Sequence, residues 1–314
     1  MAIDIAGGAG VDGGRRKARA VRLSRGDRVA LAIMAGVPTL VVGALIWFPT
    51  FASVLLSFTS WDGIGGVGTA KWVGTQNYRE IATIYPPFWP AVRHNAIWLA
   101  FLTFVATPFG LFLAYQLDKQ LRGSRIYQSI FYLPVVLSFA IVGFIWQLVY
   151  SPTQGLVNNL IGDPNDGNVI DWLGNPSLNL WAILVAVGWR HAGYIMVLYL
   201  AGLKALDPSL REAAAIDGAG EWHAFRTVVF PALRPINIII VVVTAIEALR
   251  AFDVVYVVNR GRNGLELLSV LVTDNIIGEA SRIGYGSAIA VILILISIVP
   301  IVIFVWNSFE EDVT

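Results

Sequence analysis

Four ionisable side chains interrupt long apolar stretches of this sequence: Arg190, Glu247, Arg250 and Asp253. Charged groups are costly inside a bilayer, so they usually face the interior of a helix bundle or a water-filled path. Two kinds of chemistry suit such groups. They can hydrogen-bond the hydroxyl groups of a polar solute, or they can form an internal ion-pair network that only fixes helix packing. The residue types alone leave both interpretations open.

The positions of two of these charges predict that they meet. Arg190 lies in an apolar stretch that would run inward, and Glu247 lies in the next stretch, which would run outward. At about 1.5 Å per helical residue, the two side chains lie roughly 14 and 15 Å below the outer surface. We therefore expect Arg190 and Glu247 to approach one another across a polar path in the bundle interior, with Arg250 one turn above.

A second candidate site is the polar segment LREAAAIDGAGEWHAFRTVVFPALRP, residues 210–235, which separates the same two apolar stretches. Asp207-Pro208 predicts a helix start, since Asp is a good N-cap and Pro suits the first helical position. Gly218 loosens or ends that helix. A second short helix is expected over residues 221–230, with Pro231 ending it. The product is a bent helical hairpin at a membrane face.

The elements that must position these groups are transmembrane helices. The chain is 56% hydrophobic and 14% charged, against roughly 45–50% and 25% in soluble domains. Runs of about 18 or more apolar residues indicate spanning helices, and backbone hydrogen bonding inside lipid favours helices. We therefore expect an all-α integral membrane protein. Its six spans are predicted at residues 29–51, 94–117, 128–150, 180–203, 235–257 and 284–307.

The basic residues indicate the orientation of the chain. With a cytoplasmic N-terminus, 14 of the 22 Lys and Arg residues lie inside, six lie outside and two lie within spans. This bias fits the positive-inside rule. The prediction places a basic tail (1–28), the segment 204–234 and a short tail (308–314) in the cytoplasm, around a transmembrane domain of residues 29–307.

Several kinds of chemistry are not expected in this chain. It has no cysteine, and its histidines, His94, His191 and His223, have no metal-ligand spacing. A phosphate-binding P-loop requires a Gly-Lys pair, which the sequence lacks. Nucleotide chemistry, if the protein uses it, must therefore belong to a partner subunit.

The polar segment also carries a family resemblance. EAAAIDGAGEWHAFRTVVFPALRP closely resembles the EAA loop of ABC importer permeases, with Glu-Ala-Ala, then Asp-Gly-Ala, and a later Pro after an apolar residue. In that family the loop is a coupling helix that docks into a cleft of the ATP-binding subunit. The resemblance assigns this coupling role to Glu212, Ala213, Ala214, Asp217, Gly218 and Pro231.

The resemblance covers nearly the whole chain after residue 29. WVGTQNYREI, FYLPVVLSFAIVGFIWQLVYSPTQGLVNNLIG and DWLGNPSLNLWAILVAVGW resemble the sugar and glycerol-phosphate group of these permeases. It implies the type I importer permease (MetI/MalF-like) fold. By position, a sugar-contacting Tyr of the maltose-importer type falls on Tyr194, and two polar contacts of the next span fall on Thr244 and Ala248. Since Ala248 has no polar side chain, the pocket is expected to differ, with Glu247 supplying the polar contact.

The resemblance implies a non-catalytic permease subunit of an ATP-driven importer for a carbohydrate, with a disaccharide such as trehalose suggested by overall likeness. It implies a second homologous permease, two ATP-binding subunits that hold the ATP and Mg²⁺, and an extracytoplasmic sugar-binding protein. It also implies a location in the bacterial plasma membrane; no cofactor, metal or nucleic acid is expected on this chain. The alternatives are a secondary transporter, which should show inverted repeats, a membrane enzyme, or a non-transport scaffold.

Overall fold

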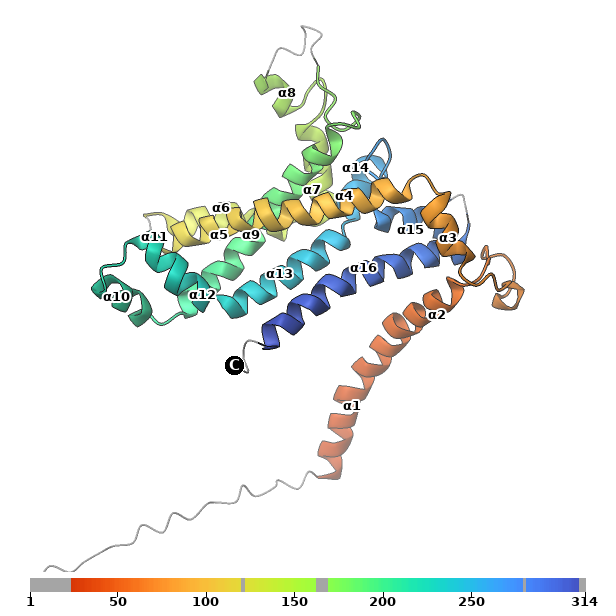
Figure 1. Cartoon of the computed structure of the whole chain (residues 1–314), viewed down its shortest axis with the longest axis horizontal. Helices are drawn as coiled ribbons and strands as arrows, with labels where there is room; N and C mark the ends of the chain where they lie inside the picture. Colours follow the sequence, from red (N-terminus) through yellow and green to blue (C-terminus); the bar gives the residue numbers. More distant parts are fainter. Residues whose placement is uncertain (1–23, 120–121, 162–168, 279–280, 311–314) are drawn as a thin grey trace, which may run out of the picture. The chain divides into compact units, whose positions relative to one another are not determined.

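The computed structural model describes residues 24–119, 122–161, 169–278 and 281–310 of the chain (Figure 1). Most of the predicted basic tail and the last four residues lie outside these ranges. The chain divides into two compact units, residues 1–51 and 52–314. In the first unit, Ser24 caps α1 through a capping box with Asp27, so the helix begins at Arg25 rather than at residue 29.

Helices make up most of the described residues, and a single β-bridge among them joins Thr59 to Trp72. π-helical turns continue three of the helices, at Gly43–Trp47, Leu102–Ala106 and Phe225–Val229. The helices are α1 (Arg25–Val42), α2 (Phe48–Leu56), α3 (Gln76–Thr83), α4 (Phe88–Phe101), α5 (Thr107–Asp118), α6 (Ser124–Val136), α7 (Phe139–Val149), α8 (Leu156–Ile161), α9 (Asn179–Ala205), α10 (Ser209–Ile216), α11 (Glu221–Ala224), α12 (Phe230–Ala232), α13 (Arg234–Leu249), α14 (Asp253–Asn259), α15 (Leu268–Ile276) and α16 (Ile283–Glu310).

Three continuous helical runs in the described ranges are long and apolar enough to cross a membrane: Arg25–Leu56, Phe88–Asp118 and Asn179–Ala205. The predicted third span is not one helix, because α6 and α7 meet at a bend of 104°. The predicted fifth span is also interrupted, since α13 ends at Leu249 and α14 begins at Asp253. The count of six spans stays a prediction.

The bend in the predicted third span lies between Pro134 and Ser138. Pro134 has no N–H for the helical ladder, and Leu137 takes an extended conformation with ψ of 142°. Ser138 then starts α7 afresh, because its side chain accepts a hydrogen bond from the backbone N–H of Ile141 (3.3 Å). Apolar periodicity reports burial but not such a break, so the sequence predicted one straight span.

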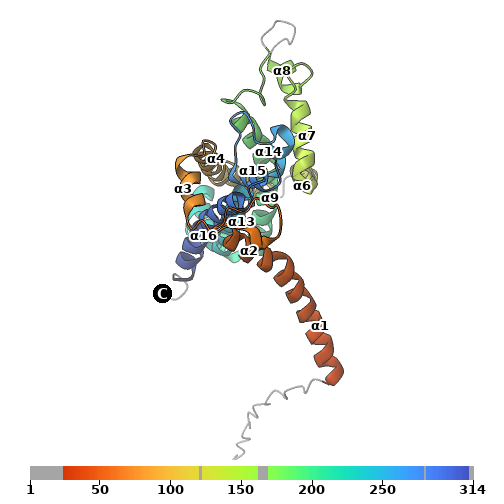
Figure 2. The ribbon, with the colours of Figure 1, turned by 90° about the vertical axis from the view of Figure 1, so that its right-hand side faces the viewer.

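Helix α9 is the central element of the second unit and contacts α4, α5, α6, α7, α13 and α14. In Figure 2, α6 and α7 lie on one side of α9, and α13 and α16 lie on the other. Close approach depends on small residues, as is common between membrane helices. A Cβ on Gly110 of α5 would lie 2.7 Å from the carbonyl oxygen of Ala192, and a Cβ on Gly193 would collide with the carbonyl oxygen of Phe131 in α6.

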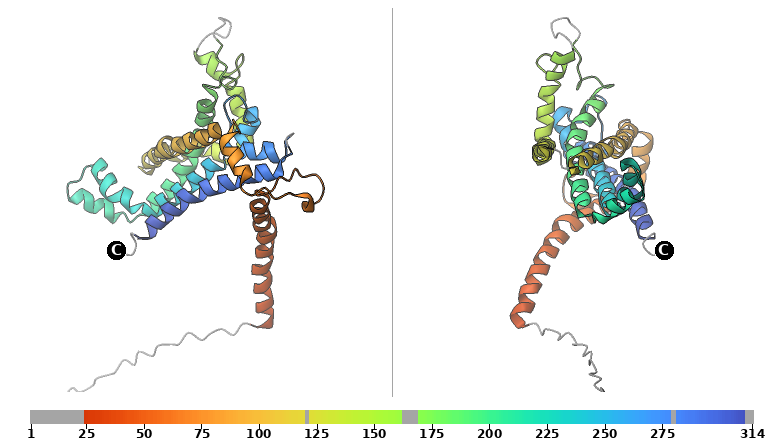
Figure 3. Two further views of the ribbon diagram at one scale, coloured as in Figure 1. Left: turned by 45° about the vertical axis from the view of Figure 1, so that its right-hand side comes forward. Right: turned by 90° about the vertical axis from the view of Figure 1, so that its left-hand side faces the viewer.

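The polar segment α10–α12 connects α9 directly to α13. It lies at the end of the second unit away from α14 and α15 (Figures 1 and 3). A buried core anchors this end, formed by residues of α5, α9, the π-turn after α11 and α13, including Leu113, Tyr199, Phe225 and Leu233. The segment α10–α12 is therefore packed against α5, α9 and α13.

Candidate functional site

Helix α10 begins at Ser209, one residue later than the sequence predicted, with Pro208 rather than Asp207 at the N-cap position. A carboxylate oxygen of Asp207 accepts a hydrogen bond from the backbone N–H of Ser209 (2.9 Å), which also holds the pKa of Asp207 below its usual value. Of the residues matched to the coupling motif, Ala214 is buried, while Glu212, Ala213 and Asp217 are exposed. Ile216 at the end of the helix is 86% exposed. The helix and its C-cap therefore present two acidic side chains, one basic side chain and several small or apolar side chains outward.

Gly218 ends α10 in a Schellman motif. Its φ is +77°, in the left-handed region that glycine adopts without a steric penalty. The N–H of Ala219 donates to the carbonyl of Ala214 (3.0 Å), and the N–H of Gly218 donates to that of Ala215 (3.1 Å). These two bonds satisfy carbonyls that the helix end would leave free. The motif thus sets the sharp turn between α10 and α11.

The second half of the segment corrects the expectation that Pro231 ends its helix. Helical structure continues through a π-turn into α12, so Pro231 lies inside a helical turn and the run ends after Ala232. Pro231 has no N–H for the helical ladder, and it lies directly after the π-turn, one residue before the run ends. In this half Phe225 and Val229 are buried, whereas Trp222 is 72% exposed.

Two ion pairs join this segment to the C-terminal end of α5, and the sequence did not predict them. The Lys119 ammonium lies 2.6 Å from a Glu221 carboxylate oxygen, and Arg211 Nη1 lies 2.6 Å from Asp118 Oδ2. The hydrogen bond to Glu221 raises the pKa of Lys119. Adjacent charges of opposite sign at residues 118–119 were the available signal, but only the fold reveals their partners.

Arg190 and Glu247 lie close together, as their positions in the sequence predicted. Arg190 Nη1 of α9 lies 3.4 Å from Glu247 Oε1 of α13, and both side chains are largely buried. The guanidinium also donates to the carbonyls of Leu137 (3.3 Å) and Val135 (3.5 Å) at the α6–α7 break. Its Cζ lies 3.8 Å from the ring centre of Phe139. Each of the three guanidinium nitrogens of Arg190 therefore has a partner within the protein.

His191 completes this cluster, although its lack of metal-ligand spacing gave no reason to select it. The ring is fully buried, and Nδ1 lies 2.9 Å from Glu247 Oε2. Nε2 lies 3.3 Å from the hydroxyls of Thr107 and Thr244. A neutral ring protonated on Nδ1 satisfies these contacts, since it donates to the carboxylate and accepts from a hydroxyl. The sequence feature that could have selected His191 is its place next to Arg190 in the middle of a predicted span.

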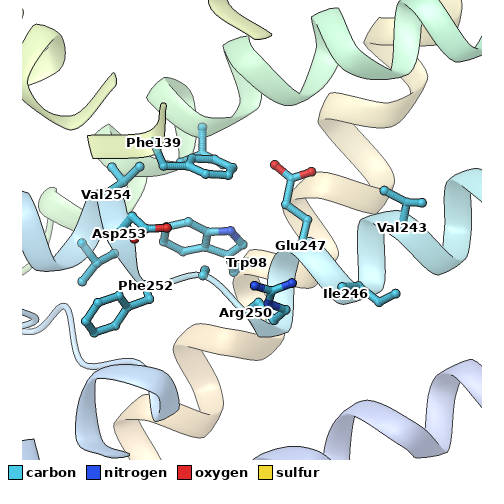
Figure 4. A pocket seen from close by; sticks show the side chains of 12 residues that line it. Trp98, Phe139, Val243, Ile246, Glu247, Arg250, Phe252, Asp253 and Val254 are labelled. Atoms are coloured by element: carbon cyan, nitrogen blue, oxygen red, sulfur yellow. The ribbon is translucent and has the colours of Figure 1, made fainter. Parts of the chain in front are cut away.

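A cavity of about 280 Å³ opens beside the cluster, at the gap between α13 and α14. Figure 4 shows Trp98 of α4 among the charged side chains of Glu247, Arg250 and Asp253. Phe139, at the start of α7, and Phe252 add aromatic walls. The volume is close to the lower end of the range of small-molecule sites, roughly 300–1,000 Å³. Aromatic faces with a few charged groups suit a polar solute that carries hydroxyls.

The candidate path residues divide between these two places. Glu247 and Arg250 line the cavity, whereas Arg190 and Thr244 belong to the cluster behind it. Tyr194 lies in neither place and packs against the buried core at the α10–α12 end of the unit. Trp98 and Phe252 line the cavity but were not predicted. Within the described ranges, no three His, Cys, Asp or Glu side chains gather as a metal site would require.

Comparison with known proteins agrees with this architecture. The model of the family described as "Binding-protein-dependent transport system inner membrane component" matches residues 106–313. The xylose/arabinose import permease protein XacH of Haloferax volcanii is 30% identical over 91% of this chain and 90% of its own length. The trehalose/maltose transport system permease protein MalF of Thermococcus litoralis is 30% identical over 76% of this chain and 81% of its own.

Among solved structures, a bacterial ABC transporter that imports the acidic polysaccharide alginate has the same fold in one of its chains. That chain aligns with a TM-score of 0.76 at 18% identity, covering 90% of this chain and 96% of its own. The alginate transporter has also been solved with an alginate-bound periplasmic protein. The match of the family model over most of the chain shows that this protein belongs to the inner-membrane permease components of binding-protein-dependent ABC transport systems.

Proposed function

We propose that this chain is a membrane permease subunit of an ATP-driven carbohydrate importer, and that α10–α12 is the surface on which an ATP-binding subunit acts. The observation that carries the proposal is the connection of two sites by the same helices. α9 and α13 hold the charged cluster behind the cavity, and their inner ends are joined by α10–α12. A force on the segment therefore reaches both helices that meet at the cluster.

The exposed surface of α10–α12 supports contact with a protein. Ile216 and Trp222 are large apolar side chains that are mostly exposed, beside the exposed carboxylate of Glu212. Apolar side chains with a charged rim are typical of a protein interface. The chain has no Gly-Lys pair for a P-loop, so the ATP and Mg²⁺ belong to two partner subunits. A second permease and an external sugar-binding protein complete the proposed assembly.

The substrate class rests on the cavity and on the relatives. Trp98, Phe139 and Phe252 offer aromatic faces, and Arg250 and Asp253 offer hydrogen-bonding groups. Of the relatives named above, one is a xylose/arabinose import permease and the other is a trehalose/maltose permease. The structural neighbour imports alginate. A disaccharide such as trehalose is the finer proposal. The bacterial plasma membrane, with both chain ends in the cytoplasm, is the proposed location.

The test is uptake by the whole complex in proteoliposomes. We expect uptake of a labelled neutral sugar that requires ATP, the binding protein and this chain. Replacing Glu212 with Ala should lower uptake while the chain remains in the membrane. Uptake that continues without the ATP-binding subunits would refute the proposal and favour a secondary transporter. Uptake of pentoses but not of trehalose would refute only the finer assignment.

A further inference from the structure

The α6–α7 break leaves backbone carbonyls without helical partners, in a stretch that the sequence predicts to lie within the membrane. Leu137 and Ser138 are both extended, with ψ of 142° and 152°, so the ladder of α6 cannot continue into α7. Unpaired carbonyls are costly in an apolar environment. Something else in the protein must therefore pair with the end of α6.

Arg190 supplies that pairing from a neighbouring helix. Its Nε donates to the carbonyl of Leu137 (3.3 Å) and its Nη2 to that of Val135 (3.5 Å), so the planar guanidinium bridges two positions of the broken turn. A cation at a helix C-terminus also opposes the negative end of the helix dipole. Gly193 keeps α9 close enough, since any Cβ there would collide with the carbonyl of Phe131.

The positive charge is neutralised by α13. Glu247 accepts from Arg190 at 3.4 Å and from His191 at 2.9 Å, and both of its carboxylate oxygens are used. His191 extends the contact to Thr107 of α5 and Thr244 of α13. One polar cluster thus ties the bent span to three other helices.

Two residues connect the polar cluster to the wall of the cavity. Phe139, the first residue of α7, faces the Arg190 guanidinium and lines the cavity. Glu247 also lines it, whereas Arg190 does not. Arg190 therefore acts on the cavity through its neighbours, by fixing where α7 begins and where the Glu247 carboxylate lies.

We propose that Arg190 is a positioning residue that holds the bend between α6 and α7 and transmits movement of α9 and α13 to the cavity wall. The inference rests on the proposed function, because movement of α9 and α13 is assigned to α10–α12. It adds to that function a mechanical link: a side chain of α9 holds the bend, so a shift of α9 moves α7. The guanidinium, rather than its charge alone, makes the link.

The experiment uses the full complex in proteoliposomes and compares Arg190→Lys and Arg190→Gln with the wild type. Arg93→Gln is the matched control, since Arg93 is exposed on α4 and takes no part in the cluster. Uptake and ATP hydrolysis are measured together. We expect sugar transported per ATP to fall at least tenfold in Arg190→Gln and by less in Arg190→Lys, because Lys keeps the charge but cannot bridge both carbonyls. Retention of the ATP-binding subunits should be unchanged.

A second measurement reports the bend itself, so that the test stands if a variant transports nothing. The chain has no cysteine, and Ile130 of α6 and Phe144 of α7 are exposed, so both can be replaced by Cys for spin labels. We expect one narrow distance distribution in the wild type and a broad one in Arg190→Gln. Equal distributions and equal transport per ATP in Arg190→Gln and Arg93→Gln would overturn the inference. Failure of the wild type to transport would instead overturn the proposed function.

Discussion

Gly218 offers a sharp prediction, because the same turn contains a matched control. Gly218 has φ of +77°, and nothing lies within 4 Å of the position of an added Cβ. Gly220 is equally open but has an ordinary φ of −65°. Any difference between Ala at the two positions therefore reports backbone conformation and not a collision.

The expected size follows from the conformation alone. A residue with a Cβ in the left-handed region costs roughly 1–2 kcal/mol, which is a factor of about 5–30 in the population of the native turn. Gly218→Asn should cost less than Gly218→Ala, because Asn tolerates this region better, and Gly218→Val should cost more. Gly220→Ala should have little effect.

Hydrogen exchange and a functional titration together test the prediction. Amides of residues 209–219 should exchange about 5–30-fold faster in Gly218→Ala than in the wild type, if local opening of the turn limits exchange. The concentration of ATP-binding subunit that gives half-maximal uptake should rise in the order Asn, Ala, Val. If Ala at 218 and Ala at 220 behave alike in both assays, the left-handed turn is not what shapes this surface.

Three further predictions concern the rest of the structure. Exchanging the charges of Asp118 and Arg211 singly should reduce ATP-coupled uptake, and the double exchange should restore much of it; failure of the double variant would argue against their pairing. Arg250→Ala should raise the half-saturating sugar concentration several-fold without releasing the ATP-binding subunits, and unchanged saturation would remove Arg250 from the site. Gly110→Val should destabilise the protein by about 1–3 kcal/mol, since its Cβ meets the carbonyl of Ala192; an unchanged melting temperature would contradict the observed packing.

Much of this molecule follows from its sequence because the membrane simplifies the problem. Long apolar runs predicted the helical class, and the positions of Arg190 and Glu247 predicted their contact, which the structure shows at 3.4 Å. Asp207 and Gly218 indicated the start and the end of α10 through local capping chemistry. The caps depend on residues near one another in the chain. The Arg190–Glu247 contact follows from the similar distance of both residues from the predicted outer surface.

The features that the sequence did not predict depend on distant partners. The bend at Leu137 follows from Pro134 together with a guanidinium that arrives from α9, and hydropathy does not register either. His191 is far in the sequence from Thr107 and Thr244, and only the fold brings their hydroxyls beside its ring. Pro231 was expected to end a helix, but helical structure continues through a π-turn and ends one residue later, after Ala232.

The most direct measurement of the central claim is a cross-link between α10 and the ATP-binding subunit. Because the chain has no cysteine, Ile216→Cys and Ile277→Cys give single-cysteine proteins with similarly exposed positions, 86% and 80% in the natural residues. Ile277 follows α15, on the predicted outer side. We predict that a short bifunctional maleimide joins the Ile216→Cys protein, but not the Ile277→Cys protein, to a cysteine-bearing ATP-binding subunit in membranes. Cross-linking of both variants, or of neither, would contradict the account.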